Sequence, residues 1–483
     1  MRNVADTYYK AVLARDPKFD GKFFVGVKTT GIYCRPICPA RPKRENVEFF
    51  SIALEAEKAG YRPCMRCRPE CAPLSPAWIG KSATVQRALK LMAAENHFER
   101  NQDRFAEQLG ITSRHLRRLF EAELGKTPKQ LFSDSRLNFA RKLIVETDLP
   151  VTDVAFSSGF SSIRRFNDAF KDRFHQAPSR FRKSKNPTAP AGTIILSLPY
   201  RPPLDWKSLI HFYATHEIGG VERISNSRYE RVFQFNGITG FLELTHSIDK
   251  SSLKLEVATS DTRSLYQVVQ NIRQMFDLEA DPIFLSHHFS GNKLMAALYR
   301  KHPGLRIPRG WDPFETSVAT ILGQLVSVDQ GRRLVRSLVE QYGEKIKRPS
   351  DGQTFFLFPT PARLAASSLS HVPTTQGRKE AIREFSKRVA ERRIHLHQAQ
   401  DPVAFREQIL SIKGVGPWTA EYVSLRALGD TDAFPQTDLI LQRALKKNPT
   451  LDINSFSPWR AYAAIYLWKE FAKKLSKQKG KKS

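Results

Sequence analysis

The sequence has 483 residues, which is too long for one ordinary domain, so two to four domains are expected. Lys and Arg number 77 against 48 Asp and Glu, which gives a formal net charge of +29. This excess favours a polyanionic partner, with nucleic acid ahead of a membrane surface and a generically basic soluble protein as the alternative. The N-terminus lacks a signal-peptide core and no apolar run approaches membrane-spanning length. A cytoplasmic protein without a membrane partner is therefore expected.

All five cysteines lie between Cys34 and Cys71, which in a reducing compartment indicates metal ligands or reactive thiols. Cys34 and Cys38 enclose three residues, Cys64 and Cys67 enclose two, and 25 residues separate the two pairs. This spacing predicts a zinc site with four thiolate ligands. Cys71 stands apart from both pairs and is interpreted as a bystander.

The segment around these cysteines, residues 1–80, is predicted to be a small α/β domain. Strands are expected at residues 23–27 and 47–50, and a short helix within residues 51–60. A unit of this size buries too little apolar surface to fold alone, so zinc would supply the missing stability. A purely structural zinc site is therefore the alternative to a reactive one.

Residues 29–36 (Thr-Thr-Gly-Ile-Tyr-Cys-Arg-Pro), followed by Cys38, Arg41 and residues 62–67, resemble the N-terminal domain of Ada-type methyl-transfer regulators. The resemblance covers nearly the whole segment. It implies that Cys34 is the nucleophile that takes a methyl group from a methylated DNA phosphate. The zinc ligands it implies are Cys34, Cys38, Cys64 and Cys67. The DNA contacts it implies are Thr30, Arg41 and Arg62.

The chemistry of such a site is coherent. A thiol that binds zinc stays deprotonated at neutral pH, so a nucleophilic thiolate is available. Methylation of one sulfur removes one negative charge from the centre, which lowers its repulsion toward phosphates and should strengthen DNA binding. Because the thioether product is not turned over, each protein molecule would act as a methyltransferase only once.

Residues 81–185 are predicted to form an all-helical domain with two helix-turn-helix units. In the first unit, a helix at residues 102–108 is followed by a turn and a second helix at 113–122. In the second unit, a helix at residues 151–156 leads into one that begins near Ser162 and continues through residue 171.

The last helix of this domain is amphipathic. Ile163, Phe166 and Phe170 form one apolar stripe, which suits a helix that packs on one side and enters a major groove on the other. This region, with residues 174–182 at its end, resembles AraC-type DNA-binding domains, which implies double-stranded DNA and RNA polymerase as partners. A helical bundle with a basic solvated face is the alternative. The candidate DNA-contacting residues are Arg114, Arg117, Arg118, Ser162, Arg164, Arg165 and Asn167.

Residues 186–192 have linker composition and separate this domain from the rest of the chain. Residues 193–281 are predicted to be a mixed α/β subdomain. Residues 282–483 are predicted to be mainly helical, for example at 313–341 and 378–390, with a basic C-terminal tail. In the mixed part, strands are expected at residues 193–198, 232–235 and 253–257, and helices at 206–215 and 265–276.

Residues 409–420 have the pattern of a helix-hairpin-helix, in which Gly414 and Gly416 form the turn. Backbone N–H groups at the start of the second helix can face a DNA phosphate, and glycine allows the close approach. Asp438 follows shortly after. A single Asp before an apolar helix is more often an N-cap than a catalytic group, but the preceding hairpin favours catalysis.

This third segment resembles the AlkA-type glycosylases of alkylated bases, which belong to the helix-hairpin-helix superfamily. The supporting stretches are residues 200–206, 303–306, 321–328 and 462–468. The resemblance implies that Asp438 is the catalytic aspartate, although Thr437 stands where the family often has a second acid. The aromatic base pocket it implies consists of Phe212, Trp418, Tyr422 and Trp468.

The sequence therefore predicts a multidomain α+β protein that responds to DNA alkylation. Methylation of Cys34 would switch on transcription, and the C-terminal domain would flip out and excise 3-methyladenine-type bases. Because Trp418 stands where strand-nicking relatives carry a lysine, a monofunctional glycosylase is expected. One Zn²⁺, a monomeric state and association with the nucleoid are also expected. The alternatives are a repair enzyme whose other domains are only DNA anchors, and a regulator whose glycosylase domain is an inactive DNA clamp.

Overall fold

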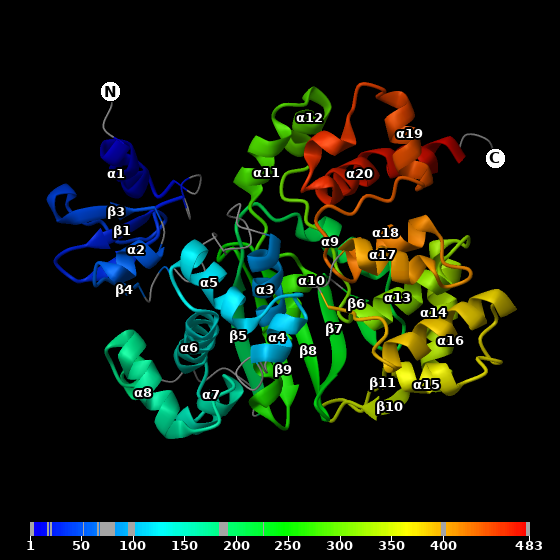
Figure 1. The fold of residues 1–483 in the computed structure, drawn as a ribbon, viewed down its shortest axis with the longest axis horizontal. Helices are drawn as coiled ribbons and strands as arrows, with labels where there is room; N and C mark the ends of the chain where they lie inside the picture. Colours follow the sequence, from blue (N-terminus) through cyan, green and yellow to red (C-terminus); the bar gives the residue numbers. More distant parts are fainter. Residues whose placement is uncertain are drawn as a thin grey trace. The chain divides into compact units, whose positions relative to one another are not determined.

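The computed structural model describes residues 4–16, 19, 22–51, 53–64, 67, 83–94, 102–182, 192–225, 227–397 and 402–479. The chain forms two compact units, residues 1–186 and 187–483 (Figure 1). Cys71 and most of the expected linker lie outside the described residues. Among the helices that are described, none has the combined length and apolar character needed to cross a bilayer.

The first unit begins with a four-stranded sheet in the order β3-β1-β2-β4. Strand β1 is buried on both faces. Val25 packs with Ala11 and Val12 of the first helix, whereas Phe24 packs with Tyr33 and the second helix. The predicted strands and short helix are thus confirmed, but the first helix was not anticipated. The elements are α1 (Val4–Ala14), β1 (Phe24–Val27), β2 (Ile32–Cys34), η2 (Arg44–Asn46), β3 (Val47–Phe50), α2 (Ala53–Lys58) and β4 (Arg62–Pro63).

The rest of the first unit is helical and contains both helix-turn-helix units. Its elements are α3 (Ala83–Ala94), α4 (Gln102–Glu107), α5 (Ser113–Leu124), α6 (Pro128–Glu146), α7 (Val151–Ser157), α8 (Ile163–Phe174) and η6 (Pro178–Phe181). The Thr112 hydroxyl caps α5 by accepting from the backbone N–H of His115 at 3.2 Å, and Ser162 caps α8 by accepting from Arg165 at 3.4 Å.

One detail of α8 differs from the prediction. Phe166, Phe170 and Phe174 are buried, but Ile163 is 38% exposed. Ile163 is the first residue of the helix, so it lies beyond the end of the packed stripe, and the aromatic row extends instead to Phe174.

The second unit begins with a five-stranded antiparallel sheet in the order β5-β9-β8-β7-β6. The elements of this part are β5 (Thr193–Pro199), α9 (Trp206–Thr215), β6 (Glu222–Ser225), β7 (Arg228–Phe235), β8 (Ile238–Ser247), β9 (Ser252–Thr259), η7 (Thr262–Ser264) and α10 (Leu265–Met275). The expected mixture of strands and helices is therefore present, with β6 and β8 in addition to the predicted strands.

Helices dominate the remainder, as predicted. They are α11 (Pro282–Phe289), α12 (Lys293–Lys301), α13 (Pro313–Leu322), α14 (Val328–Tyr342), α15 (Pro361–Ala366), α16 (Gln376–Ala390), α17 (Pro402–Leu410), α18 (Pro417–Arg426), α19 (Leu439–Lys447), η8 (Ile453–Phe456) and α20 (Arg460–Lys479). A hairpin of β10 (Glu344–Lys347) and β11 (Thr354–Leu357) was not anticipated.

The prediction of one helix over residues 313–341 was wrong. The helix ends at Leu322 and restarts at Val328, with Leu325 in the turn at φ +54°. Ser327 caps the second helix by accepting from the N–H of Gln330 at 3.2 Å. The apolar periodicity continues across the turn because α13 and α14 both pack on one core, which hides the break from a sequence reading.

Candidate functional sites

The four cysteines of the predicted metal site come together in the first unit. Strand β2 ends at Cys34 and pairs in parallel with β4, which places Cys64 beside it. The backbone N–H of Cys64 donates to the carbonyl of Tyr33 at 2.9 Å. All four sulfur atoms, of Cys34, Cys38, Cys64 and Cys67, lie within 4.8 Å of one another. Four thiolates at this spacing fit the tetrahedral coordination of zinc.

Arg35 holds the fourth ligand in place. Its backbone N–H donates to Sγ of Cys67 at 3.3 Å, and its buried side chain donates to the carbonyl of Cys67 at 3.2 Å. Each candidate DNA contact lies within about four residues of one of these cysteines in the chain. Thr30 lies exposed in the turn between β1 and β2, Arg41 is exposed after Cys38, and Arg62 is half-buried in β4.

The strand that carries Cys34 is linked to the helix-turn-helix region by a cluster of charges. The Tyr33 hydroxyl donates to Glu57 of α2 at 2.9 Å. The same carboxylate accepts from Lys126 at 2.7 Å and from Arg173 of α8 at 2.6 Å. Both cations also pair with Asp134 of α6, at 2.7 and 3.2 Å. The cluster therefore joins strand β2, which ends at Cys34, to the last turn of helix α8 within the first unit.

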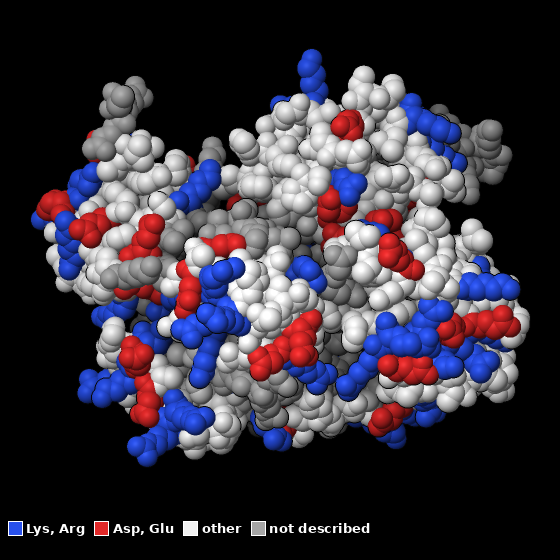
Figure 2. All heavy atoms as spheres, viewed as in Figure 1, with Lys and Arg blue, Asp and Glu red and all other residues white. Residues whose placement is uncertain are grey.

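The candidate base-reading side chains lie on two helices of the first unit. Arg114, Arg117 and Arg118 are exposed on α5. Arg164, Arg165 and Asn167 are exposed near the start of α8. Figure 2 shows Lys and Arg side chains gathered over α5 and α8. Within α5, Arg117 pairs with Glu121 at 2.9 Å, and a guanidinium nitrogen of Arg118 lies 3.1 Å from Nδ1 of His115.

In the second unit, Asp438 is both the N-cap of α19 and the centre of a polar site. Its Oδ1 accepts from the backbone N–H groups of Ile440 and Leu441, at 3.0 and 3.1 Å. Oδ1 also accepts from the indole Nε1 of Trp468 at 2.9 Å, whereas Oδ2 accepts from Trp418 Nε1 at 3.1 Å. Three donors converge on Oδ1 and one on Oδ2, so Oδ2 retains more capacity to act on a substrate.

Three of the four predicted pocket aromatics lie together around Asp438. Trp418 and Tyr422 stack with ring centroids 4.8 Å apart, and Trp468 meets Tyr422 edge-on at 6.1 Å. Phe212 of α9 stacks on His216 at 4.0 Å, and the guanidinium of Arg426 covers the ring at 3.8 Å. Phe212 thus joins the cluster through Arg426 and not through a free aromatic face.

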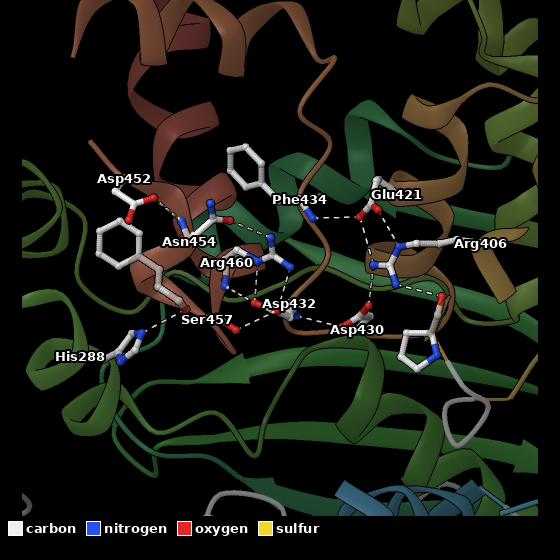
Figure 3. Close-up of polar contacts among 12 residues, drawn as sticks. His288, Arg406, Glu421, Asp430, Asp432, Phe434, Asp452, Asn454, Ser457 and Arg460 are labelled. Carbon is white, nitrogen blue, oxygen red and sulfur yellow. Dashed lines mark hydrogen bonds and ion pairs between the residues drawn. The ribbon is translucent and has the colours of Figure 1, made fainter. Parts of the chain in front are cut away.

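The loop that leads to Asp438 is held on two sides (Figure 3). Toward the hairpin, Glu421 accepts from Arg406 at 2.6 Å and from the backbone N–H of Phe434 at 3.1 Å. Arg406 also donates to Asp430 at 2.8 Å. Toward α20, Asp432 accepts from Arg460 through two bonds of 2.9 and 2.8 Å. These ion pairs fix the loop between the hairpin and the helix that carries Trp468.

The helix-hairpin-helix forms as predicted, with α17 and α18 joined through a turn. Gly414 has φ +90°, which a side chain would strain, and Gly416 caps α18 without a side-chain hydrogen bond. The free N–H groups at the start of α18 are therefore available to a phosphate.

Sequence reasoning missed one feature beside the hairpin. Leu325 is fully exposed, and its neighbour Gln324 donates to the hydroxyl of Thr419 on α18 at 2.7 Å. Ser327 could have indicated a new helix start after Leu325, which would have placed this leucine in an exposed turn. An exposed apolar side chain of this kind is a common means of inserting between DNA bases.

Comparison with known proteins finds three regions of the chain that match known domain families. Residues 7–70 match the metal binding domain of Ada, residues 105–184 match a helix-turn-helix domain, and residues 195–312 match the AlkA N-terminal domain. A Mycobacterium tuberculosis protein described as "Probable bifunctional transcriptional activator/DNA repair enzyme AlkA" is 36% identical over 474 residues, covering 95% of each chain. The chain belongs to this family of bifunctional proteins.

Two further relatives resemble different parts of this bifunctional chain. DNA-3-methyladenine glycosylase 2 of Escherichia coli is 27% identical and covers 56% of this chain and 96% of its own length. The bifunctional transcriptional activator/DNA repair enzyme Ada of the same organism is 38% identical over 156 residues, or 32% of this chain and 42% of its own. The three resemblances, the multidomain fold and the zinc site are thereby confirmed.

Proposed function

We propose that this protein senses alkylation of DNA with its first unit and repairs alkylated bases with its second. The observation that carries the sensor half is the four-sulfur cluster at the end of β2. The observation that carries the repair half is Asp438, held by the indoles of Trp418 and Trp468 next to a helix-hairpin-helix. DNA is the substrate of both halves.

In the sensor, Cys34 is the nucleophile. Zinc, when bound, keeps the thiols in their anionic form. The Cys34 sulfur attacks the methyl carbon of a phosphate methyl triester, the methyl–oxygen bond breaks, and the phosphodiester leaves with the electron pair. The product is a thioether at Cys34, which the protein does not reverse. Cys38, Cys64 and Cys67 position Cys34, while Thr30, Arg41 and Arg62 contact the DNA.

The loss of one negative charge then increases the affinity of the first unit for DNA. With the zinc domain held more firmly on DNA, the exposed residues of α5 and α8 occupy a promoter and recruit RNA polymerase. The basic side chains named above, with Ser162 at the start of α8, make the contacts. In the alternative, in which these domains are only DNA anchors, transcription would not respond to methylation of Cys34.

In the repair unit, the damaged nucleotide leaves the stack and its base enters the aromatic cluster. Leu325 fills the space that the nucleotide vacates, and the backbone N–H groups of Gly416 and Trp418, on either side of Pro417, bind the DNA backbone. Asp438 stabilises positive charge on the sugar as the base departs and positions a water molecule for attack. The enzyme is monofunctional, because Trp418 stands beside Asp438 where strand cleavage would need a lysine amine.

An assay of both activities on one preparation tests the proposal. Duplex DNA that contains methylphosphotriesters should transfer a methyl group to the Cys34 peptide, as read by mass spectrometry. Alkylated duplex should release 3-methyladenine without strand nicks, and Asp438→Asn should lose the release. If wild type and Asp438→Asn release the base equally poorly, the second unit is a DNA clamp and the repair half is wrong. In vitro transcription before and after methylation separates the regulator from the DNA-anchor alternative.

A further inference from the structure

Arg426, in the last turn of α18, is a buried cation without an acidic partner. Arg426 is only 5% exposed, and its Nε atom has no hydrogen-bond partner. Among the described residues, no carboxylate pairs with it. Other buried arginines of this unit are compensated: Arg231 pairs with Glu222 at 3.1 Å and also with Glu315, and Arg306 donates to two backbone carbonyls. Because an uncompensated buried charge is unfavourable, Arg426 needs an explanation.

Arg426 belongs to the same face of α18 as two pocket aromatics. Trp418, Tyr422 and Arg426 follow one another at intervals of four residues, which places them on one side of the helix. Helical side chains lean toward the N-terminus, so Arg426 leans back toward Tyr422, and its guanidinium carbon lies 5.8 Å from that ring. Along this side of α18, Trp418 donates to Asp438 at one end, and Arg426 places a cation at the other end.

The guanidinium of Arg426 also covers one face of the Phe212 ring. Phe212 has His216 on one face at 4.0 Å and Arg426 on the other at 3.8 Å, so both faces are taken. Burial, and then the charge of Arg426, lowers the pKa of His216 to about 4, which leaves this imidazole neutral at pH 7. Burial also lowers the pKa of Arg426, but a guanidinium stays charged. Arg426 is thus the cation of this part of the pocket.

We propose that Arg426 is a specificity-determining residue of the base pocket. Its guanidinium N–H groups donate to a carbonyl or ring-nitrogen acceptor on the extruded base, and its charge disfavours bases that carry a full positive charge. The aromatic faces of Trp418, Tyr422 and Trp468 act in the opposite sense, because they attract cationic bases. The balance lets one pocket accept neutral 6-oxopurines as well as cationic alkylpurines. This inference rests on the proposed glycosylase activity.

The test compares two bases in otherwise identical duplexes, in single-turnover reactions of the full chain. Hypoxanthine is the neutral probe with a carbonyl acceptor, and 3-methyladenine is the cationic probe. Wild type should release both. Arg426→Gln should lower the ratio of the hypoxanthine rate to the 3-methyladenine rate by about 10- to 100-fold, the effect of losing a charged hydrogen bond. Arg426→Lys keeps the charge but lacks the planar guanidinium, so its rate ratio should lie between those of wild type and Arg426→Gln.

Controls separate specificity from folding. Arg300→Gln, at an exposed arginine of α12, should leave the ratio unchanged. Arg426→Met keeps the side-chain length and serves if the glutamine variant unfolds. A duplex with a base-free tetrahydrofuran site should bind wild type and Arg426 variants equally, because it lacks the contacted base.

Two outcomes would overturn the inference. The first is a ratio of the two rates that does not change in the Arg426 variants, including the case in which both rates fall equally. The second is a wild type that releases 3-methyladenine but no hypoxanthine. A wild type that releases neither base would instead refute the proposed glycosylase activity itself.

Discussion

The hydroxyl of Tyr33, the residue before the proposed nucleophile Cys34, donates a 2.9 Å hydrogen bond to Oε1 of Glu57. Glu57 also accepts from Lys126 and Arg173, which belong to the helix-turn-helix region. The side chains of Glu57, Lys126 and Arg173 are each less than a fifth exposed, so solvent screens their attraction only in part. Strand β2, which ends at Cys34, is therefore connected to helix α8 inside the first unit.

Replacement of Glu57 should destabilise the first unit in a pH-dependent way. Burial raises the pKa of Glu57, but Arg173 and Lys126 outweigh it and hold the pKa below its usual value. A lowered folded-state pKa means that the stabilisation is complete above the unfolded-state pKa, about 4.3, and is lost as the pH falls through the folded value. Glu57→Gln should cost about 2–3 kcal/mol at pH 7.

Hydrogen exchange of α2 and α8 between pH 3 and 7 measures this effect. The difference in exchange protection between wild type and Glu57→Gln should shrink below about pH 4. The cysteines contribute equally to both proteins, so their effect cancels in this difference. A constant difference across that range would contradict a charge-based role. Lys142→Gln, which removes an ion pair with Glu146 inside α6, is a control that should leave exchange in α2 unchanged.

Cys34 alone should carry the transferred methyl group. After reaction with methylphosphotriester DNA, mass spectrometry of tryptic peptides should find one methyl group on Cys34 and none on Cys38, Cys64 or Cys67. Cys34→Ser should abolish transfer, whereas Cys71→Ser should transfer normally. Methyl on another ligand would show that the nucleophile is misassigned.

Removal of zinc should separate the two halves of the protein. A chelator should abolish methyl transfer and loosen the sheet of β1 to β4, because the four thiolates lose the ion that neutralises them. No cysteine follows Cys71, so the rate of base release should stay within about twofold of the untreated protein. Circular dichroism and the two activity assays measure these effects, and restored transfer on addition of Zn²⁺ is the control.

Asp438→Asn should lower the single-turnover rate of base release by roughly 100-fold or more, because the developing positive charge on the sugar loses its counter-charge. The asparagine keeps the size, and its single oxygen can still accept from the α19 backbone and from Trp468, although its amide nitrogen cannot accept from Trp418. Affinity for a tetrahydrofuran duplex should therefore change little. Equal losses in rate and in duplex affinity would indicate a structural role for Asp438 instead.

The ion pairs around residues 430–434 should position Asp438. Glu421→Gln weakens the contacts to Arg406 and Phe434, so the rate of base release should fall by about 10-fold with little change in KM. A double-mutant cycle of Glu421→Gln and Arg406→Gln should show coupling of about 1 kcal/mol or more in the rate, since the two side chains touch. Additive effects would mean that the pair does not act as a unit.

The features that depend on local spacing could be predicted from the order of residues alone. The intervals between Cys34, Cys38, Cys64 and Cys67 specify a tetrahedral thiolate site, and Gly414 and Gly416 specify the hairpin turn, because both depend on residues that are close in the chain. The geometry of Asp438 is compatible with its being both the N-cap of α19 and the proposed catalytic group. The carboxylate caps α19 with one oxygen and keeps the other toward Trp418.

The relationships between distant segments became visible only in the folded chain. The break at Leu325 is invisible to periodicity because both flanking helices pack on one core. The link from Tyr33 through Glu57 to Arg173 spans more than a hundred residues, and the contact of Phe212 with Arg426 joins α9 to α18. Such contacts form when folding brings separate elements together, and no local pattern records which face of Phe212 a cation will cover.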